Sequence, residues 1–420
     1  MKKILWISPF APYDNVTHAG GKVHNYYIKR FKDSGRFDVT LLSLCLKDEV
    51  IQLDLDKYGI KNDIFISEKT VIAKYYRKIL NGLSYINPFD KYQAVCLAYE
   101  EKHIRKLLSN YIKSGVRPDI VIMQWTFALM LLPIIKKAFP DCFAVAIEED
   151  VTFQSYYRMW KTRKKEAEKI FWEHRYRKEK QLELQLLQKV DMVVTNNPKD
   201  TDMLEKCGIQ KASIFTSMSY FDNYININRN AVGQDILFYG AMARPENYES
   251  AIWFIKEVMS QLEYDTIRFI IVGSNPPKEL LRYQSDRVCI TGYVEDVSSY
   301  FSSCMCMAAP LLRGAGIKIK ILEGMSAGIP ILTNEVGIEG IPARNQKEFF
   351  YCEKASDYVK VIKDIINKKI NASEVGQNAR RFIKDNYNIK TKTDQLIELI
   401  DVITEKERMY DRKDERNMGL

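Results

Sequence analysis

Residues 314–330 read Gly314-Ala315-Gly316-Ile317-Lys318-Ile319-Lys320-Ile321-Leu322-Glu323-Gly324-Met325-Ser326-Ala327-Gly328-Ile329-Pro330. This pattern predicts a glycine turn, then a short helix, then a buried strand. Small residues at such a turn let backbone N–H groups approach an anion, and the start of the following helix adds a partial positive charge. The stretch therefore indicates an α/β unit whose glycine turn can hold a diphosphate.

The expected helix carries polar and apolar residues on different faces. At 3.6 residues per turn, Gly316, Lys320 and Glu323 share one face, and aliphatic residues occupy another. A lysine in this place can neutralise phosphate oxygens, and a carboxylate one turn further along can accept hydrogen bonds from a ribose diol. The plainer alternative is a solvated Lys320–Glu323 pair on an ordinary helix, since such pairs are common at this spacing.

Short apolar strands alternate with helical segments along the chain. A first series is expected at 3–9, 39–44, 120–124, 143–149, 192–196 and 212–216. A second series begins at Ile236 and continues at 268–273, 288–291, 304–309 and 329–333. The segment 220–234, which is rich in Asn and Asp, is the expected linker. The alternation predicts parallel sheets covered on both faces, so the expected fold class is α/β with two doubly wound domains.

Length and composition fit a globular enzyme with two domains. The chain has 420 residues, and single cores stop growing near ~250–300 residues. Hydrophobic residues make up 46% of the chain and charged residues 28%, which excludes an intrinsically disordered chain. No apolar run approaches the ~20 residues needed to span a bilayer, and the segment Met1–Ile7 is too short for a signal peptide. We therefore expect a cytoplasmic protein.

The formal net charge is +9, and much of it lies in one helical segment rich in aromatic residues. Between 156 and 180, basic residues outnumber acidic ones, and tyrosines, tryptophans and a phenylalanine lie among them. This combination predicts peripheral contact with an anionic membrane through 156–180. The alternative is a long solvated helix whose aromatic side chains pack inward. Nucleic acid is not an expected partner, because no recognition motif accompanies the charge.

Two places in the first half of the chain are candidates for a site. Gly20 and Gly21 open a helix after the first strand, where the backbone can approach phosphate or an acceptor closely; a plain loop is the alternative. Glu148, Glu149 and Asp150 end the fourth strand. Adjacent carboxylates repel and raise one another's pKa, so such a cluster is costly unless it is solvated, paired or functional. As an alternative, Asp150 caps the helix that follows.

Several motifs in the second half of the chain occur in the order and spacing of a known family. They are Leu237-Phe238-Tyr239-Gly240, Arg244-Pro245-Glu246-Asn247, Ile271-Val272-Gly273-Ser274-Asn275-Pro276-Pro277, Thr291-Gly292-Tyr293-Val294-Glu295-Asp296-Val297 and Pro310-Leu311-Leu312-Arg313. With the stretch at 314–330, this region resembles the family-four retaining glycosyltransferases (group 1), which include sucrose synthases and bacterial mannosyltransferases.

The resemblance implies the GT-B architecture, in which two Rossmann-like domains face each other across a cleft. It implies an acceptor-binding domain at 1–225 and a nucleotide-sugar-binding domain at 226–388. The remaining segment, 389–420, is then a helix that crosses back to the first domain, followed by a charged tail.

The resemblance also implies which residues form the site. The expected donor-binding residues are Gly20, Gly21, Gly240, Arg244, Tyr293, Val294, Gly314, Ala315, Gly316, Ile317, Lys318, Lys320 and Glu323. The expected catalytic residues are Glu149, Asp150 and Lys320. Glu149 stands where relatives often have a histidine that contacts the donor sugar, and Asp150 is the alternative if the alignment shifts by one residue.

The chain departs from the family pattern at other positions too. Ala315 replaces the first glutamate of the family's Glu-x7-Glu pair, and Ala241 and Asn247 replace an arginine and a lysine that some relatives supply. Many bacterial relatives instead have Gly-x-Gly-Ile-Arg-x-Lys, so Lys318 stands for that arginine. Among the cations that remain for the diphosphate, Lys320 ranks first.

The reaction implied by the resemblance is transfer of a sugar from a UDP- or GDP-linked donor, with retention at the anomeric carbon. No metal and no other cofactor are expected, since fixed cations and helix amides stabilise the departing diphosphate; Asp54-Leu55-Asp56 is interpreted as a pair of surface carboxylates. The expected acceptor is a glycan, a lipid-linked sugar or a protein, in polysaccharide biosynthesis at the inner face of the plasma membrane.

Two other hypotheses stay open. The first is a catalytically silent homologue that binds nucleotide sugar or partners an active enzyme. The second is another enzyme on the same fold, such as an epimerase or a phosphorylase, because fold resemblance alone does not decide function.

Overall fold

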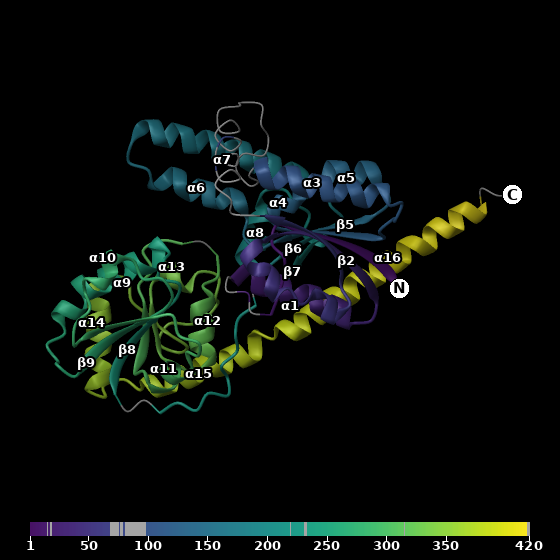
Figure 1. Cartoon of the computed structure of the whole chain (residues 1–420). Coiled ribbons are helices and arrows are strands. Elements are labelled where there is room, and N and C mark those ends of the chain that lie inside the picture. Colours follow the sequence, from purple (N-terminus) through teal and green to yellow (C-terminus); the bar gives the residue numbers. More distant parts are fainter. Residues whose placement is uncertain are drawn as a thin grey trace. The chain divides into compact units, whose positions relative to one another are not determined.

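The computed structural model describes residues 1–14, 16, 19–67, 75, 79, 98–218, 220–230, 233–314 and 316–417. The chain divides into two compact units (Figure 1). Unit 1 comprises Met1–Tyr220 and Ile389–Leu420, and unit 2 comprises Phe221–Asn388. The chain therefore enters and leaves unit 2 through two separate segments.

A seven-stranded parallel sheet forms the centre of unit 1, in the order β3-β2-β1-β4-β5-β6-β7. Its strands are β1 (Lys2–Ser8), β2 (Phe37–Leu46), β3 (Lys61–Ser67), β4 (Ile120–Gln124), β5 (Phe143–Glu148), β6 (Met192–Thr195) and β7 (Ile214–Thr216). Its helices are α1 (Ala19–Asp33), α3 (Ala98–Lys113), α4 (Trp125–Leu129), α5 (Leu132–Ala138), α6 (Thr152–Thr162), α7 (Glu166–Leu187), α8 (Pro198–Lys206) and α16 (Ile389–Asn417), with short 3-10 turns η1 (Lys47–Gln52), η2 (Leu55–Tyr58) and η3 (Lys211–Ser213).

A six-stranded parallel sheet forms the centre of unit 2, in the order β10-β9-β8-β11-β12-β13. Its strands are β8 (Gln234–Tyr239), β9 (Ile267–Val272), β10 (Val288–Gly292), β11 (Cys306–Ala309), β12 (Ile331–Thr333) and β13 (Phe350–Tyr351). Its helices are α9 (Pro245–Glu257), α10 (Lys278–Leu281), α11 (Ser298–Ser303), α12 (Ile319–Ser326), α13 (Glu335–Ile338), α14 (Ala355–Ile366) and α15 (Ala372–Asn386), with the 3-10 turn η4 (Met259–Gln261).

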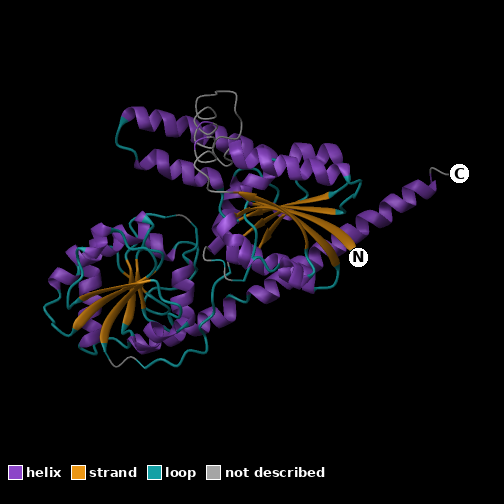
Figure 2. Cartoon of the chain, in the orientation of Figure 1, coloured by secondary structure: helices purple, strands orange, loops and turns teal. Residues whose placement is uncertain are grey.

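Helices cover both faces of each sheet (Figure 2). Apolar side chains from both faces of the central strands are buried, as expected when a parallel sheet is covered on both sides. The expected α/β class with two doubly wound sheets is thereby confirmed. In each sheet the strand order reverses at one switch point, which lies between β1 and β4 in unit 1 and between β8 and β11 in unit 2.

Two strands have no counterpart among those expected from the sequence. β3 lies at an edge of the first sheet and is mostly exposed, so it lacks the apolar run that marks a buried strand. β13 is two residues long and lies at an edge of the second sheet. Edge position and short length weaken the hydrophobic signal in both cases.

Helix α16 belongs to unit 1 and packs on it through apolar residues. Leu396 and Ile400 are fully buried, and Lys2 forms an ion pair with Asp401 at 2.7 Å. The charged segment after Thr404 continues the helix to Asn417, because it contains strong helix formers and neither Gly nor Pro. No described helix, α16 included, is long and apolar enough to cross a bilayer.

The segment 156–180 does not form one long helix. It contains most of α6 and the first part of α7, which are joined by the three residues Arg163–Lys165. The first turn of α6 is capped by Glu183 of α7, whose carboxylate accepts the backbone N–H groups of Thr152 and Phe153, both at 2.9 Å. The alternative that Asp150 caps this helix is therefore wrong, since the N-cap residue is Val151.

Candidate functional site

The β8/β11 switch point of unit 2 brings several predicted donor residues together. Gly240 directly follows β8, and residues 310–318 follow β11 and lead into α12. In open parallel sheets, ligands bind beyond the carboxyl ends of the strands at such a point. Tyr239 at the end of β8 and Lys320 in the first turn of α12 both belong to this region.

Two glycines allow close packing at this edge of the sheet. Gly273, which follows β9, has φ of +156°, and a Cβ there would lie 1.7 Å from the carbonyl oxygen of Gly240. Gly240 itself has φ of +153°, and its Cβ would lie 2.8 Å from Nζ of Lys320. A side chain at position 240 would therefore displace the lysine.

Lys320 is held by a tether from α9. Its ammonium donates to Oδ1 of Asn247 at 2.5 Å, and Nδ2 of Asn247 donates to the carbonyl of Ala241 at 2.8 Å. The ammonium also lies 5.0 Å from the ring centroid of Phe238. Burial lowers the pKa of Lys320 to about 7, and the attraction of Glu246 offsets part of that effect. The site thus holds a lysine that is only partly charged at neutral pH, and a bound anion would favour its charged form.

The loop before α12 carries a second lysine, and the helix begins later than the sequence predicts. Gly316 has φ of +67° and Lys318 is extended at the N-cap, so α12 begins at Ile319 and neither Gly316 nor Ile317 lies on it. Nζ of Lys318 donates to the carbonyl of Gly316 at 2.5 Å and forms an ion pair with Glu339 at 3.3 Å. Lys318 therefore braces the loop.

Gly314 lies in the same loop, whereas Ala315 lies outside the described residues. Gly314 has φ of +146°, and a Cβ there would lie 3.0 Å from Cε of Lys318. The backbone conformation thus favours glycine at 314, and an added Cβ would also contact the side chain of Lys318 closely.

Glu323 is buried rather than solvated. It is 3% exposed, and its Oε1 accepts the backbone N–H of Asp222 at 3.4 Å. Burial, followed by the charge of Glu323, raises the pKa of Tyr239 well above its ordinary value. The alternative of a solvated Lys320–Glu323 pair is therefore wrong, and Glu323 is a carboxylate held inside the switch-point region.

Three other predicted donor residues lie on the surface of unit 2 or near it. Arg244 is exposed at the N-cap of α9. Tyr293 follows the edge strand β10 and is 71% exposed, and Val294 beside it is partly buried. Among the described contacts, none joins Tyr293 or Val294 to Lys320, and β10 lies two strands away from β8 in the sheet.

In unit 1, a chain of hydrogen bonds holds Glu149 at the carboxyl edge of the sheet. Gln124 at the end of β4 donates to Oε1 of Glu149 at 2.5 Å, and Asn196 after β6 donates to Oε2 at 2.7 Å. The indole N–H of Trp6 donates to Oε1 of Gln124 at 3.3 Å, and the hydroxyl of Tyr27 donates to Oδ1 of Asn196 at 3.4 Å. Both oxygens of Glu149 thus accept amide N–H groups, which fix the carboxyl group in one orientation.

The environment of Glu149 favours its protonated form. Burial and then the neighbouring Asp150 raise the pKa of Glu149 to about 8, and the two amide donors oppose this in part. Glu148 is 1% exposed, and burial raises its pKa to about 7. Asp150 is exposed. At neutral pH Glu149 is therefore mostly a neutral acid, which can donate a hydrogen bond as well as accept one.

Gly20 and Gly21 lie in the first turn of α1, which follows β1 at the unit 1 switch point. A Cβ at Gly20 would lie 2.7 Å from Cζ2 of Trp125, the first residue of α4. The ring of Trp125 also packs edge-on against Phe10, with centroids 5.6 Å apart. The contact with Trp125 is thus a packing reason for glycine at position 20.

The sequence did not predict the contacts that three polar residues make in these sites. Gln124 and Asn196 lie at or directly after the ends of buried strands, and Asn247 lies in the first turn of α9. The signal in the sequence is a polar residue placed directly where an apolar strand ends. Such residues can meet, because the carboxyl ends of parallel strands share one edge of the sheet.

Asp54 and Asp56 are engaged with other side chains. Nζ of Lys29 lies 2.8 Å from Asp54, and Nδ2 of Asn62 donates to Asp56 at 3.1 Å. Within the described residues, no group of three or more His, Cys, Asp or Glu side chains is arranged to hold a metal ion.

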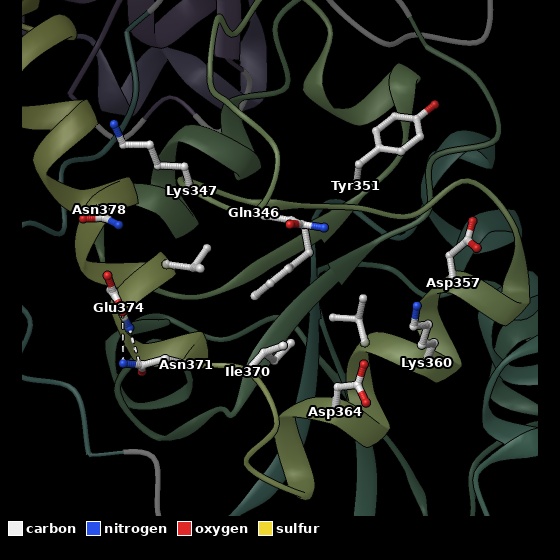
Figure 3. Close-up of a pocket in the computed structure, with 13 residues that line it drawn as sticks. Gln346, Lys347, Tyr351, Asp357, Lys360, Asp364, Ile370, Asn371, Glu374 and Asn378 are labelled. Atoms are coloured by element: carbon white, nitrogen blue, oxygen red, sulfur yellow. Dashed lines mark hydrogen bonds between the residues drawn. The ribbon is translucent and has the colours of Figure 1, made fainter.

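Unit 2 also contains a hollow of about 670 Å³ next to β13, α14 and α15 (Figure 3). Its polar lining includes Lys347, Lys360 and Asp364, and Asn371 donates to Glu374 at 3.2 Å on one side of it. None of the predicted donor residues lines this hollow. It is therefore separate from the Lys320 region.

Comparisons with known proteins agree with this architecture. Residues 233–368 match the family described as "Glycosyl transferases group 1". A Klebsiella pneumoniae protein described as "Uncharacterized 44.6 kDa protein in cps region" is 27% identical over 170 residues. That match covers 37% of this chain and 43% of the relative, so it spans less than half of the relative's length.

Solved structures resemble nearly the whole chain. HepE of Anabaena, in complex with UDP and glucose, has a TM-score of 0.63 at 13% identity, covering 95% of this chain and 99% of that one. Sucrose-phosphate synthase of Thermosynechococcus elongatus has a TM-score of 0.66 at 13% identity, covering 96% and 99%. An S. aureus TarM variant bound to fondaparinux, α-GlcNAc-glycerol and UDP has a TM-score of 0.63 at 13% identity, covering 95% and 99%. The chain therefore has the two-domain GT-B fold of these structures, and its residues 233–368 match the glycosyl transferases group 1 family.

Proposed function

We propose that the protein transfers a sugar from a nucleotide-diphosphate sugar to an acceptor, as a family-four retaining glycosyltransferase. The observation that carries the proposal is Lys320, a tethered lysine beside Gly240 at the β8/β11 switch point, whose pKa burial lowers to about 7. A switch-point lysine next to a glycine turn and a helix start is an arrangement suited to binding a diphosphate. The group 1 match over 233–368 and the UDP named with HepE and TarM support the same assignment.

In this proposal, unit 2 holds the donor. Lys320 binds the diphosphate, the backbone amides of the 314–317 loop line the diphosphate and the sugar, and Glu323 accepts the ribose hydroxyls. Arg244 is a further cation for the diphosphate, and Tyr293 and Val294 flank the base. Gly20 and Gly21 of unit 1 belong to the same proposed donor-binding set. The donor is a UDP- or GDP-linked sugar.

Departure of the diphosphate is the demanding step, because negative charge grows on it as the glycosidic C–O bond lengthens. A fixed ammonium and helix amides stabilise that charge more in the transition state than in the ground state. Lys320 and the start of α12 supply both, so we propose transfer without a metal ion. Retention at the anomeric carbon is proposed from the resemblance to the family-four enzymes.

We assign the acceptor side to unit 1. Glu149 of this unit stands where the resemblance places a histidine that contacts the donor sugar. As a neutral acid fixed by Gln124 and Asn196, it donates a hydrogen bond to a hydroxyl of the donor sugar. Asp150, next to it and exposed, is the second candidate for this role. The acceptor is a glycan, a lipid-linked sugar or a protein.

Calorimetry with UDP-, GDP-, ADP- and TDP-sugars, without added metal, tests the donor site. We expect micromolar binding of one nucleotide class and at least about a 30-fold loss in Lys320→Ala, since removing one partner of a desolvated charge pair costs about 2–5 kcal/mol. The matched control is Lys369→Ala, an exposed lysine of the same unit, which should bind like the wild type.

Turnover is tested separately. The bound donor is incubated with glycan and lipid-linked acceptors, and the anomeric configuration of the product is assigned by NMR. Binding without transfer to any acceptor would favour the catalytically silent homologue. Absence of binding in the folded wild type would overturn the proposal.

A further inference from the structure

Helix α7 carries apolar side chains on two opposite faces. At about 100° per residue, Trp172 and Tyr176 lie on one face. The apolar Ala167, Ile170 and Phe171, at spacings i, i+3 and i+4, lie on the other face, with the polar His174 at i+7; these four residues are here called the outer stripe. A helix at the surface needs only one apolar face to pack, so the second face calls for an explanation.

The inner face of α7 is closed by aromatic packing against α6. The ring of Tyr176 stacks on Trp160 with centroids 5.7 Å apart and lies 5.3 Å from Tyr157. Trp172 lies 5.9 Å from Tyr156 in the same interface. One alternative from the sequence is that the aromatic side chains of this segment pack inward. That is correct for Trp172 and Tyr176, but it does not account for the outer stripe.

The outer stripe is exposed to solvent. Ile170 is 64% exposed and Phe171 is 42% exposed, and Ala167 and His174 are also exposed. Met159, close to the end of α6, is 40% exposed. Grouped apolar side chains on an otherwise charged surface mark an interaction site more often than isolated ones do.

Positive charge surrounds these apolar residues. The segment 158–169, at the tip of the hairpin, contains six basic and two acidic residues. The two acids are paired within the hairpin: Glu166 lies 3.2 Å from Lys169, and Glu168 lies 3.9 Å from Arg163. Lys164 and Lys165 of the connecting turn are exposed. The tip therefore presents an excess of positive charge beside the outer stripe.

The hairpin is anchored at its other end. Glu183 is fully buried and binds the first backbone N–H groups of α6. Together with the stacked rings, this contact fixes α6 against α7. The outer stripe, Lys164 and Lys165 thus lie on or between folded helices. Binding a partner therefore costs little conformational entropy for ordering them.

We propose that the outer stripe and the connecting turn form a docking surface for an anionic lipid bilayer. Ile170 and Phe171 enter the boundary between headgroups and acyl chains, and Lys164 and Lys165 contact the lipid phosphates. A nucleic acid would engage the lysines but leave Ile170 in water, whereas a bilayer surface accommodates both kinds of side chain. The proposal is independent of glycosyl transfer, because α6 and α7 contain none of the proposed donor residues.

Flotation of the full chain with lipid vesicles tests this surface, with no nucleotide or acceptor added. We expect binding to phosphatidylcholine vesicles that contain phosphatidylglycerol and little binding to phosphatidylcholine alone. The double variant Ile170→Ser/Phe171→Ser should lower the partition coefficient at least about tenfold. Lys164→Glu/Lys165→Glu should lower it by about tenfold or more and remove most of its salt dependence.

Matched variants elsewhere in unit 1 serve as controls. Ile51 is 91% exposed, and Lys113 and Lys137 are exposed, so Ile51→Ser and Lys113→Glu/Lys137→Glu should bind vesicles like the wild type. Circular dichroism melts establish that each variant is folded. Equal losses in the control variants, or no binding of the wild type to anionic vesicles, would overturn the proposal. So would tight binding of an oligonucleotide that displaces the vesicles and depends on the lysine pair alone.

Discussion

The ammonium group of Lys320 lies 2.5 Å from Oδ1 of Asn247, and the amide of Asn247 is itself fixed by a bond to the carbonyl of Ala241. Lys320 lies in α12 and Asn247 in α9, so α12 carries the cation and α9 carries the acceptor that holds it. Hydrogen bonds to charged groups contribute about 1.5–3 kcal/mol. We therefore assign Asn247 a positioning role for the proposed diphosphate site.

Asn247→Leu keeps the size of the side chain and removes the tether. We expect the nucleotide dissociation constant to rise about tenfold, because Lys320 then has to be ordered by the ligand. Calorimetry measures the change, and Asn378→Leu in α15 is the control. An unchanged constant in folded Asn247→Leu would show that Lys320 needs no tether.

Nucleotide binding should take up a proton near neutral pH. The pKa of Lys320 is about 7 in the free protein, and an adjacent diphosphate raises it. Affinity should therefore fall as the pH rises above about 7. Calorimetry in buffers of different ionisation enthalpy measures the uptake, which should disappear in Lys320→Met. Uptake of the same size in that variant would assign the proton to another group.

Gly240→Ala should abolish nucleotide binding. The new Cβ would lie 2.8 Å from Nζ of Lys320, at a backbone φ of +153° that strains any L side chain. Gly208→Ala is the control that separates backbone strain from displacement of Lys320. The φ of Gly208 is +91°, and no atom lies within 4 Å of the added Cβ. The Gly208 variant should lose some stability and bind nucleotide normally; equal binding losses in both variants would contradict displacement of Lys320.

The stability of unit 1 should decrease between about pH 5 and pH 8. Burial raises the pKa of Glu179 to about 8 and that of Glu148 to about 7. At pH values between the pKa of the unfolded chain and the higher pKa of the folded protein, the native state binds more protons than the unfolded state. The free energy of unfolding therefore falls as the pH rises. Urea unfolding over this pH range measures the slope.

Glu179→Gln tests the origin of that slope. Glu179 is 2% exposed, and an amide at this position cannot ionise, so the variant should lose part of the slope and be more stable than the wild type at pH 8. Glu398→Gln, an exposed residue of α16, should leave the slope unchanged. A Glu179 variant with the full wild-type slope would exclude Glu179 as its source.

The sequence predicts most strands of both sheets to within about two residues, because buried parallel strands are continuous apolar runs. It misplaces the start of α12, since the positive φ of Gly316 and the extended Lys318 keep the loop open until Ile319. A glycine in the sequence indicates that the backbone can adopt a positive φ, but it does not determine where the helix begins.

Side-chain partners are the part that the sequence does not give. Gln124 and Asn196 meet at Glu149 only because β4, β5 and β6 are neighbours in the sheet. Asn247 meets Lys320 across 73 positions of sequence. Such contacts depend on strand order and helix placement, which no local pattern encodes.

The return of α16 to unit 1 has a consequence for biosynthesis. Leu396 and Ile400 complete the apolar cluster on one face of the unit 1 sheet, yet they are translated after all of unit 2. Domains generally fold as units in the order in which they are made, but here the inserted unit is complete first. Unit 1 keeps the α16-contacting part of that apolar face uncovered on the ribosome until the last helix emerges. Premature termination near residue 388 would therefore yield a chain with one finished unit and one in need of chaperones.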